Sequence, residues 1–554
     1  MPKSKEESKP ILLPSSKDSG KEEKEKPSSQ FRDRQSKELV IGLSGPIGCG
    51  LNSVRDQLKT DLETAGYEVQ IIKLSDLIIK LSDLPSIRSI PGFPSKSDMN
   101  SKTRYQSLQK AGNVLRGSYG HDFLAELAVA NISIYRYKKI LEDDDSDLED
   151  LEKVQKYVPI RRAYIIDQLK HQDEVALLRV VYGNLFYLVG VFSSDEQRKS
   201  NLKRGLDLSD IEVAEIMQED RKGENEFGQQ LEKTLKLSDL FIRNTNQHVD
   251  RISKQFNRFI RMLHGVVGIT PTSHEVAMYV AYSAGLGSAC LSRQVGACIT
   301  DSEGNIMATG CNDVPKAGGG LYSSESAPDS RCVNQEGGIC YNDRYKNLLK
   351  DKISRVIQEA VESIVLSTEH SSSVSSNDKG EISDYLASLI KSNTELKDLL
   401  EYSRSVHAEM DAITTISRKG GGSTRGAYLY TTTYPCHHCA RHIIASGIKK
   451  VFYIEPYEKS LAKELHRDAI EIDPEEDHTE ASYVQFMHFE GVAPTQYQSF
   501  FGVNTERKDH LGKLVRVSPG INSKIIAQQL DSYRDMEAKI YDYIAASSLH
   551  QIFS

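Results

Sequence analysis

The chain of 554 residues contains no tryptophan, only eight cysteines, and few aromatic residues, which make up 7% of the sequence. Eight cysteines are too sparse for a disulfide framework, so closely spaced ones are better interpreted as metal ligands or catalytic groups. No apolar run approaches the roughly 20 residues that a membrane-spanning helix needs. The first residues also lack an apolar stretch long enough for a signal peptide. We therefore expect a cytoplasmic protein with no membrane partner.

An excess of positive charge is missing as well. The net charge is −8, and the isoelectric point is about 6.1. Proteins that grip polynucleotides usually carry a basic stripe, because neutralisation of phosphates dominates their affinity. The absence of tryptophan also removes one kind of stacking platform for bases. The average charge therefore favours a small-molecule substrate over a nucleic-acid strand.

Composition and hydrophobic pattern divide the chain into three parts. Residues 1–36 are rich in Ser, Lys, Glu and Pro, which predicts a disordered tail. In residues 37–265, apolar strand-like runs alternate with helical patterns, which predicts a parallel sheet with crossover helices. In residues 266–554, a helix after Pro271, a hairpin and two further strands predict a second α/β unit, with a polar insertion at about 316–403. The final segment, from about residue 522, has helical periodicity.

Two short motifs carry the chemistry. H-A-E at 407–409 and P-C-H-H-C at 435–439 match, in order, the signature of the zinc-dependent deaminases. Cys436 and Cys439 are three residues apart, so on a helix they lie on one face within reach of a single ion. His407 would complete three zinc ligands and leave the fourth position open for water, the mark of a catalytic site.

Alternatives for this zinc site are a structural half-site formed by C-x-x-C alone, and extra ligands from the two histidines between the cysteines. His437 or His438 as a fourth protein ligand would close the site to water. The combination of both motifs favours the catalytic interpretation.

Glu409 is the predicted proton shuttle. It would take a proton from water, pass it to the ring nitrogen of the base and help the amino group to leave as ammonia. His407 and Glu409 are two residues apart, so they would point to nearly opposite faces of a regular helix. Both reach one ion only if His407 lies at the start of the helix, and we predict that placement.

Sequence around these motifs resembles the deoxycytidylate deaminase family. The resemblance is carried by R-Q-V-G-A at 293–297, T-G-C-N at 309–312 and Y-I-E-P-Y-E-K-S at 453–460. It implies that Asn312 contacts the sugar of the substrate. The alternative is a purely structural role, in which Asn312 caps a turn. The family often has Gly after this Asn, where this chain has Asp313.

Three further residues are candidates for substrate binding. Tyr434 would border the base pocket or, alternatively, pack as an ordinary strand residue. Lys459 and Ser460 would contact phosphate or, alternatively, lie in a solvated loop. The resemblance does not explain the insertion, whose Cys332 and Cys340 lack the spacing of a standard zinc pair but would form a second metal site if they shared a ligand elsewhere.

A glycine-rich segment, G-P-I-G-C-G at 45–50, follows the first predicted strand, as a phosphate-binding loop does. Leu51 and Asn52 replace the Lys and the Ser/Thr of an active loop, which argues against phosphoryl transfer. The segment resembles a nucleoside-monophosphate kinase that is degenerate in catalysis, and the alternative is a purely structural turn. The candidate nucleotide-binding residues are Gly45, Gly48, Gly50 and Ser53, and the kinase resemblance extends to Asp167, Arg198 and Arg204.

A P-loop kinase-like unit ahead of a deoxycytidylate deaminase resembles the bacterial antiphage deoxycytidine nucleotide deaminases. The resemblance implies a homo-oligomeric zinc hydrolase that converts dCTP, and dCMP as a second substrate, to deoxyuridine nucleotides. This activity would deplete dCTP during infection. It also implies control by a regulatory nucleotide or an inhibitory small RNA. The alternatives are a housekeeping dCMP deaminase for thymidylate supply, a deaminase of tRNA or single-stranded DNA, and a sensor with a structural zinc.

Overall fold

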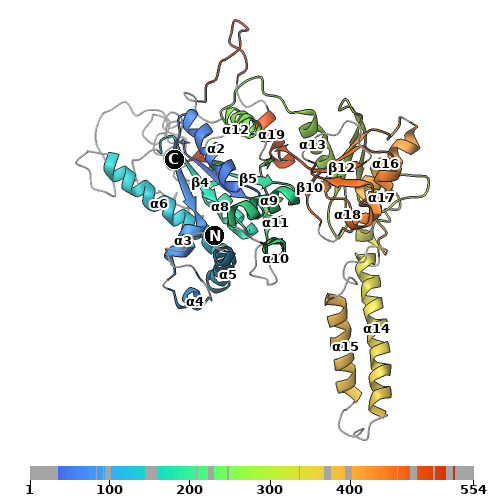
Figure 1. Cartoon of the computed structure of the whole chain (residues 1–554). Coiled ribbons are helices and arrows are strands. Elements are labelled where there is room, and N and C mark those ends of the chain that lie inside the picture. Colours follow the sequence, from blue (N-terminus) through green and yellow to red (C-terminus); the bar gives the residue numbers. More distant parts are fainter. Residues whose placement is uncertain are drawn as a thin grey trace, which may run out of the picture.

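The computed structural model describes residues 35–82, 84–90, 93, 102–143, 159–206, 209–221, 230–245, 249–335, 337–366, 376–393, 402–420, 422–457, 460–474, 483–502, 506–519 and 528–530. Two six-stranded sheets, each flanked by helices, lie next to each other (Figure 1). This arrangement confirms the predicted α/β class. Within these ranges, no helix is long and apolar enough to cross a membrane.

The first sheet has the strand order β13-β6-β5-β2-β4-β3. Its five parallel strands are β2 (Leu39–Ser44), β3 (Glu68–Lys73), β4 (Arg162–Asp167), β5 (Phe186–Phe192) and β6 (Leu240–Arg243). Every residue of β2, β4, β5 and β6 is buried, as continuous apolar runs in a parallel sheet covered on both faces require. The predicted parallel sheet in this part of the chain is confirmed.

Helices pack on both faces of this sheet. They are α2 (Leu51–Thr64), α3 (Leu74–Lys80), α4 (Pro85–Arg88), α5 (Lys102–Tyr119), α6 (Phe123–Asp143), α8 (Gln172–Tyr182), α9 (Asp195–Leu206), α10 (Asp210–Arg221), α11 (Leu231–Leu235) and α12 (Val249–Leu263), with a 3-10 turn at Gly183–Leu185. The chain turns between α5 and α6 at Gly120, whose φ of +125° a residue with a side chain rarely adopts.

Several sequence-based expectations fall at the limits of the described residues. The last two residues of the predicted disordered tail are ordered instead. Gln35–Ser36 form strand β1 and pair with β14 (Gln528–Gln529). Three segments lie wholly or mostly outside the described residues. They are residues 1–34, most of the acidic sequence at 141–152, and most of the segment predicted to be helical from residue 522.

The second sheet has the order β11-β12-β10-β9-β7-β8. Its strands are β7 (Gly296–Thr300), β8 (Ile306–Cys311), β9 (Tyr428–Thr433), β10 (Lys450–Glu455), β11 (Ile470–Ile472) and β12 (Val484–His488). The first two form the predicted antiparallel hairpin, and β9 to β12 are mutually parallel. The helices of this unit are α13 (Ser273–Gly285), α16 (Ala408–Lys419), α17 (His437–Ala445) and α18 (Ala462–Leu465), with a 3-10 turn at Cys332–Asn334. A 3-10 turn at Pro494–Gln496 and helix α19 (Tyr497–Phe501) follow the last strand of this sheet.

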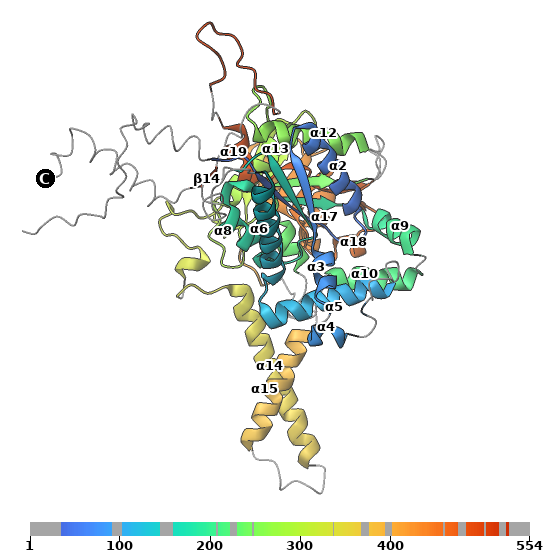
Figure 2. The same ribbon diagram turned by 90° about the vertical axis from the view of Figure 1, so that its left-hand side faces the viewer.

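The predicted insertion contains a helical hairpin that projects from the second unit. It consists of α14 (Tyr341–Leu366) and α15 (Ser376–Asn393), which lie side by side in both views (Figures 1 and 2). A hydrogen bond of 2.6 Å from the Ser354 hydroxyl to the Asp384 carboxylate joins the two helices. The hairpin leaves the strand order of the sheet undisturbed.

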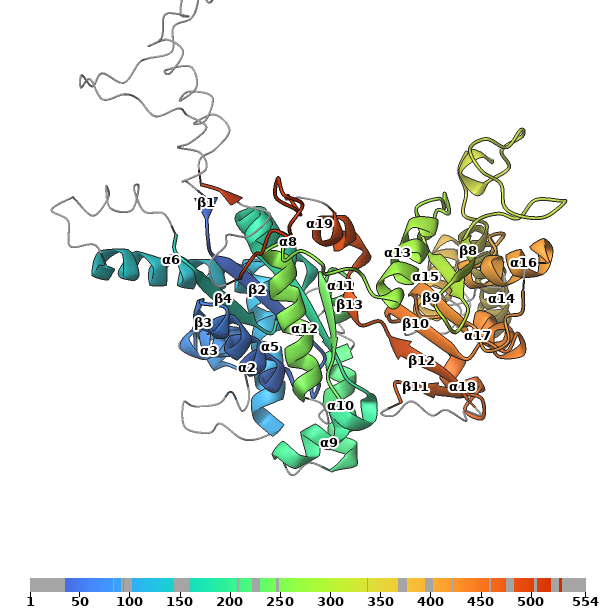
Figure 3. The ribbon, with the colours of Figure 1, turned by 90° about the horizontal axis from the view of Figure 1, so that it is seen from above.

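The chain returns to the first unit after it has completed the second sheet. β13 (Gly491–Val492) pairs antiparallel with β6, and Ala493 N–H donates to the Asp239 carbonyl at 2.9 Å. Figure 3 shows α19 beyond this strand, close to α12. A simple division at residue 265 therefore misses one strand, because residues 491–492 belong to the first sheet.

Candidate zinc and catalytic site

The three predicted zinc ligands come together at the starts of two helices. His407 is the N-cap of α16, with extended backbone angles of φ −77° and ψ 154°, as predicted from its spacing to Glu409. Cys436 is the N-cap of α17, and Cys439 lies in the first turn of that helix. His407 Nδ1 lies 3.3 Å from Cys436 Sγ and 3.4 Å from Cys439 Sγ. One imidazole and two thiols at such distances fit a zinc ion, which is the cofactor of this site.

The electrostatics of Cys436 also suit a metal ligand. Hydrogen bonds with Cys439 and His407 lower the pKa of the Cys436 thiol to about 3, against the opposing effect of burial. A thiolate is the form of cysteine that binds a metal. The start of α17 favours the same negative charge, because the positive end of a helix dipole lies there.

Glu409 lies beside the ligands in the first turn of α16. Its side chain is only 4% exposed, and its Oε2 lies 3.5 Å from Cys439 Sγ. Burial raises the pKa of Glu409 above the ordinary value for a glutamate. A carboxyl group with a raised pKa takes up and returns a proton more readily near neutral pH, which suits a proton shuttle.

A cavity of about 670 Å³ reaches the zinc ligands His407 and Cys439. Sequence reasoning missed its basic lining residues, Lys316 and Arg418, which come from the loop after β8 and the last turn of α16. The sequence feature that could have indicated this part of the cavity lining is the triple glycine at 318–320. A side-chain carbon at Gly319 would lie 2.7 Å from Arg418 Cδ, and φ there is +99°. Glu409 is buried beneath this cavity and is not among its lining residues.

Asn312 is placed close to the hairpin by hydrogen bonds with the backbone. Its Oδ1 accepts from Val295 N–H at 2.7 Å, and its Nδ2 donates to the Arg293 carbonyl at 2.7 Å. Its neighbour Asp313 accepts from Ala289 N–H at 2.9 Å. The side chain of Asn312 thus supports the loop that precedes β7, and its contact with a sugar stays a prediction.

Two other predicted substrate residues that the structure describes, Tyr434 and Ser460, do not line the cavity at the zinc ligands. Tyr434 lines a different cavity, between the two units, and its ring packs edge-on against Tyr453. The Ser460 hydroxyl donates to the Pro435 carbonyl at 2.8 Å and so supports the turn before Cys436. Lys459 lies outside the described residues. Substrate contacts by these residues stay predictions.

The glycine-rich loop follows β2, and Gly50 is the N-cap of α2 with φ +74°. A carboxylate of the chain itself lies against this loop: Ile47 N–H donates to Asp220 Oδ2 at 2.6 Å. Gly48, with φ +80°, has no room for a side chain, since an added Cβ would lie 2.7 Å from the Arg198 carbonyl. The Ser53 hydroxyl donates to the Gly50 carbonyl at 2.8 Å. Nucleotide binding by the loop stays a prediction.

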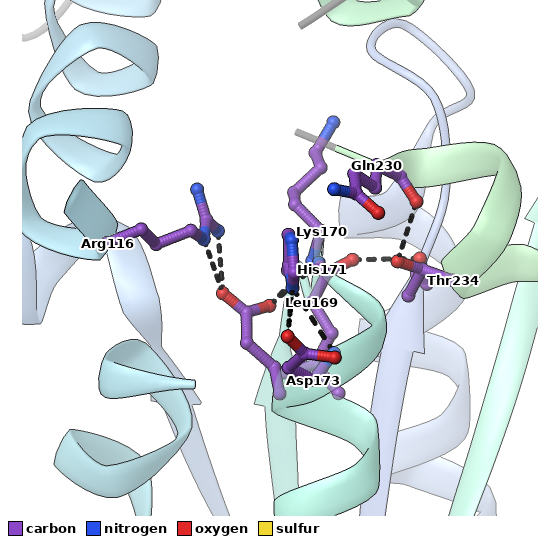
Figure 4. Close-up of polar contacts among 9 residues, drawn as sticks. Arg116, Leu169, Lys170, His171, Asp173, Gln230 and Thr234 are labelled. Atoms are coloured by element: carbon purple, nitrogen blue, oxygen red, sulfur yellow. Dashed lines mark hydrogen bonds and ion pairs between the residues drawn. The ribbon is translucent and has the colours of Figure 1, made fainter. Parts of the chain in front are cut away.

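Buried charges surround the carboxyl end of β4, next to this loop (Figure 4). Lys170 pairs with Asp220, and Arg116 pairs with Glu174 at 2.6 Å. His171 is the N-cap of α8, and its Nδ1 accepts from Asp173 N–H at 3.2 Å. These contacts fix the loop and the start of α8.

A second group of potential metal ligands, His121, His171 and Asp173, has atoms within 4.8 Å of one another. The rings of His121 and His171 stack with their centroids 4.7 Å apart, and His171 also accepts the capping hydrogen bond from Asp173 N–H. These contacts explain the group as a structural feature of the start of α8. In the part of the chain that the structure describes, neither group of potential ligands includes Cys332 or Cys340.

Comparison with known proteins agrees with the chemistry of the site. The family profile described as "Cytidine and deoxycytidylate deaminase zinc-binding region" matches residues 271–455. The deoxycytidylate deaminase of Enterobacteria phage T4 is 30% identical over 187 residues, which cover 34% of this chain and 79% of the phage protein. The deoxycytidylate deaminase of phage T2 is 32% identical over 187 residues, which cover 34% of this chain and 81% of the phage protein.

Among solved structures, a dCMP deaminase from cyanophage S-TIM5 in complex with dCMP and dUMP shares 18% identity with this chain. The match covers 40% of this chain and 98% of the phage protein, and its TM-score of 0.22 is too low to support an argument. The family profile and the two phage relatives therefore carry the assignment: this chain belongs to the cytidine and deoxycytidylate deaminase family of zinc-dependent enzymes.

Proposed function

We propose that the protein deaminates deoxycytidine nucleotides, dCTP and dCMP, to the corresponding deoxyuridine nucleotides, and that this activity depletes dCTP in antiphage defence. The observation that carries the proposal is the placement of Glu409 beside the three ligand side chains of His407, Cys436 and Cys439. This arrangement joins a metal site with an open position to a buried carboxyl group that can move protons.

A zinc ion held by His407, Cys436 and Cys439 would supply a water of lowered pKa, about 7 in enzymes of this kind. Glu409 accepts one proton from the attacking water and delivers it to N3 of the cytosine ring, while the oxygen of the water bonds to C4. Glu409 then passes the second proton of the water to the amino group, and the C4–N bond breaks as ammonia leaves. The water and the amino group are thus exchanged for a carbonyl and ammonia, with no redox partner.

Two basic side chains support a phosphorylated substrate. Lys316 and Arg418 line the cavity that reaches the zinc ligands. Ammonium and guanidinium groups pair well with phosphate oxygens. The names of the phage T4 and phage T2 relatives, both deoxycytidylate deaminases, support a deoxycytidine nucleotide in particular.

The order of the two units supports the defence role and its control. Residues 37–265 form an α/β unit with a glycine-rich loop ahead of the deaminase, as in the antiphage enzymes that the sequence resembles. We expect this unit to receive a regulatory nucleotide or an inhibitory small RNA, in a cytoplasmic homo-oligomer.

The decisive experiment is an assay of ammonia release and nucleotide products with the purified full chain. It offers dCTP, dCMP, CTP, cytidine and cytosine-containing single-stranded DNA side by side. Glu409→Gln should reduce the rate roughly 10²-fold to 10⁴-fold, the usual contribution of a proton-transfer group, while its zinc content by mass spectrometry stays unchanged. Glu303→Gln, in the exposed hairpin turn, is the matched control.

Substrate ranking separates the alternatives. Conversion of dCTP that Glu409→Gln abolishes, together with a fall in the dCTP pool of infected cells, supports the proposal. Activity confined to dCMP would identify a housekeeping enzyme, and activity confined to DNA would identify a polynucleotide deaminase. Unchanged activity after removal of zinc by a chelator would overturn the mechanism itself.

A further inference from the structure

A cavity of about 730 Å³ lies between the two units, where the carboxyl ends of their parallel strands face each other. The first unit contributes Phe192, at the end of β5, and the following Ser193. The second contributes Tyr434, after β9, and His488, at the end of β12. Ligands of open α/β sheets bind outside the carboxyl ends of the strands. None of the described residues that line this cavity lines the cavity at the zinc ligands.

Two buried hydroxyl groups in this cavity lack a hydrogen-bond partner among the described residues: Tyr434 Oη and Ser193 Oγ. Each residue is only 8% exposed. The ring of Tyr434 is held at 4.9 Å from Tyr453 and 5.5 Å from Phe486. Native proteins seldom leave buried polar groups unpaired, and a bound ligand is one way to satisfy them.

Part of the cavity wall is apolar and aromatic. It includes Phe192, Leu231, Leu235, Tyr453, Tyr457 and Ile472. Such walls bind the faces of a planar ring, while a few placed polar groups fix its orientation. The volume suits a molecule of nucleoside size, since ligand pockets typically span about 300–1,000 Å³.

The charges of the cavity oppose a phosphate. Six carboxylates line it: Asp195, Glu196, Glu232, Glu464, Glu471 and Asp473. The basic side chains that line it are Arg198, Lys463 and His488, and His488 already contacts Asp473 at 2.6 Å. Arg198 already pairs with Asp195 at 3.1 Å and donates to the Ile47 carbonyl at 2.9 Å. Carboxylates only accept hydrogen bonds when ionised, so they favour a ligand with N–H donors. Glu196 and Glu464 are exposed and mark the side that is open to solvent.

We propose that this cavity binds an unphosphorylated heterocycle of nucleoside size that carries an amino group. The hydroxyls of Tyr434 and Ser193 hydrogen-bond with the ligand, and the carboxylates accept from its amino group. The ligand would touch the segment that holds a zinc ligand, because Tyr434 precedes Cys436 by two residues and Ser460 ties down the intervening Pro435. The proposal does not depend on the substrate of the zinc site.

The test is calorimetric titration of the zinc-loaded full chain with deoxyadenosine and deoxyguanosine, which carry an amino group but no cytosine for the zinc site, compared with dAMP and spermidine. Both nucleosides should bind saturably. Tyr434→Phe and Ser193→Ala should each raise the dissociation constant roughly 2-fold to 12-fold, the effect of one lost hydrogen bond. The variants should keep the melting temperature of the wild type, because neither hydroxyl bonds to a residue that the structure describes.

Two matched variants serve as controls. Tyr428→Phe alters a tyrosine of β9, the strand that precedes Tyr434. Ser238→Ala removes another buried serine hydroxyl that has no partner in the described residues. Neither Tyr428 nor Ser238 lines the cavity. Both should leave the dissociation constants unchanged. The proposal is wrong if neither nucleoside binds, if Tyr434→Phe and Ser193→Ala bind as tightly as the controls, or if dAMP or spermidine binds as tightly as deoxyadenosine.

Discussion

At the scale of single residues, the site depends on two helix starts. His407 caps α16 and Cys436 caps α17, so each ligand lies just outside regular helical geometry. Extended backbone at a cap turns the His407 side chain toward the same place as Glu409, although a regular helix would separate residues two apart by about 200°. The close spacing of H-x-E is therefore a consequence of the cap.

Arg418 and Lys316 provide a test of phosphate recognition. We expect Arg418→Ala and Lys316→Ala to raise KM for dCMP and dCTP roughly 10-fold to 100-fold, because each removes a charge-assisted contact. The KM for the nucleoside deoxycytidine should stay the same. Lys419→Ala, an exposed neighbour outside the cavity, is the control. An equal loss with nucleoside and nucleotide would assign the two residues to another role.

Asn312 provides a test of support for the loop before β7. Asn312→Ala removes two hydrogen bonds of 2.7 Å to backbone groups and leaves these groups without their partner. We expect the free energy of unfolding to fall by roughly 1–3 kcal/mol, measured by urea denaturation. If stability is unchanged while KM rises, the side chain acts on the sugar and its backbone contacts are dispensable.

At the scale of elements, an ion pair fixes the ends of neighbouring strands β11 and β12. Asp473 Oδ2 lies 2.6 Å from His488 Nδ1, and the Asp473 carboxylate also accepts from His488 N–H at 2.9 Å. Burial alone would raise the pKa of Asp473, but His488 and Arg243 outweigh it, so that the pKa is lower than usual. Tyr453 Oη, at 3.1 Å from His488 Nδ1, completes the cluster.

The sign of this pKa shift predicts how stability depends on pH. The pKa of Asp473 is lower in the folded state than in the unfolded state, where it is about 3.9 for Asp. The ionised carboxylate therefore stabilises the fold above the unfolded pKa, and this stabilisation is lost as pH falls through the folded pKa. Asp473→Asn should therefore cost about 2 kcal/mol at pH 5, and the cost should shrink below about pH 4. Urea denaturation of both proteins at several pH values measures it. A cost that is constant down to pH 3 would contradict the assignment.

At the scale of the whole molecule, the two units are joined by more than a linker. β13 pairs with β6, Val492 N–H donates to Glu275 at 2.9 Å, and Arg258 pairs with Glu275 at 2.7 Å. Gln496 Nε2 also donates to Asp239 at 2.9 Å. Residues 491–496 thus cover the edge of the first sheet, which would otherwise expose unpaired backbone groups.

This joint predicts that the first unit is not independent. A protein truncated after residue 268 should show a lower melting temperature than the corresponding transition of the full chain, and should self-associate, because β6 becomes an exposed edge strand. Circular dichroism and size-exclusion chromatography measure both effects. Co-expression of residues 269–554 should restore a monodisperse complex. A truncated protein that is monomeric and equally stable would show that the joint contributes little.

The sequence by itself determined the chemistry of the site and the local elements that carry it. The motifs at 407–409 and 435–439 specify ligand types and spacing, and the apolar runs specify the strands, because both depend on neighbours along the chain. Only the tertiary structure decided the pairing of residues 491–492 with β6, the basic cavity lining of Lys316 and Arg418, and the separation of Tyr434 from that cavity. These features depend on which strands become neighbours in space, and packing between distant segments, rather than local periodicity, determines that choice.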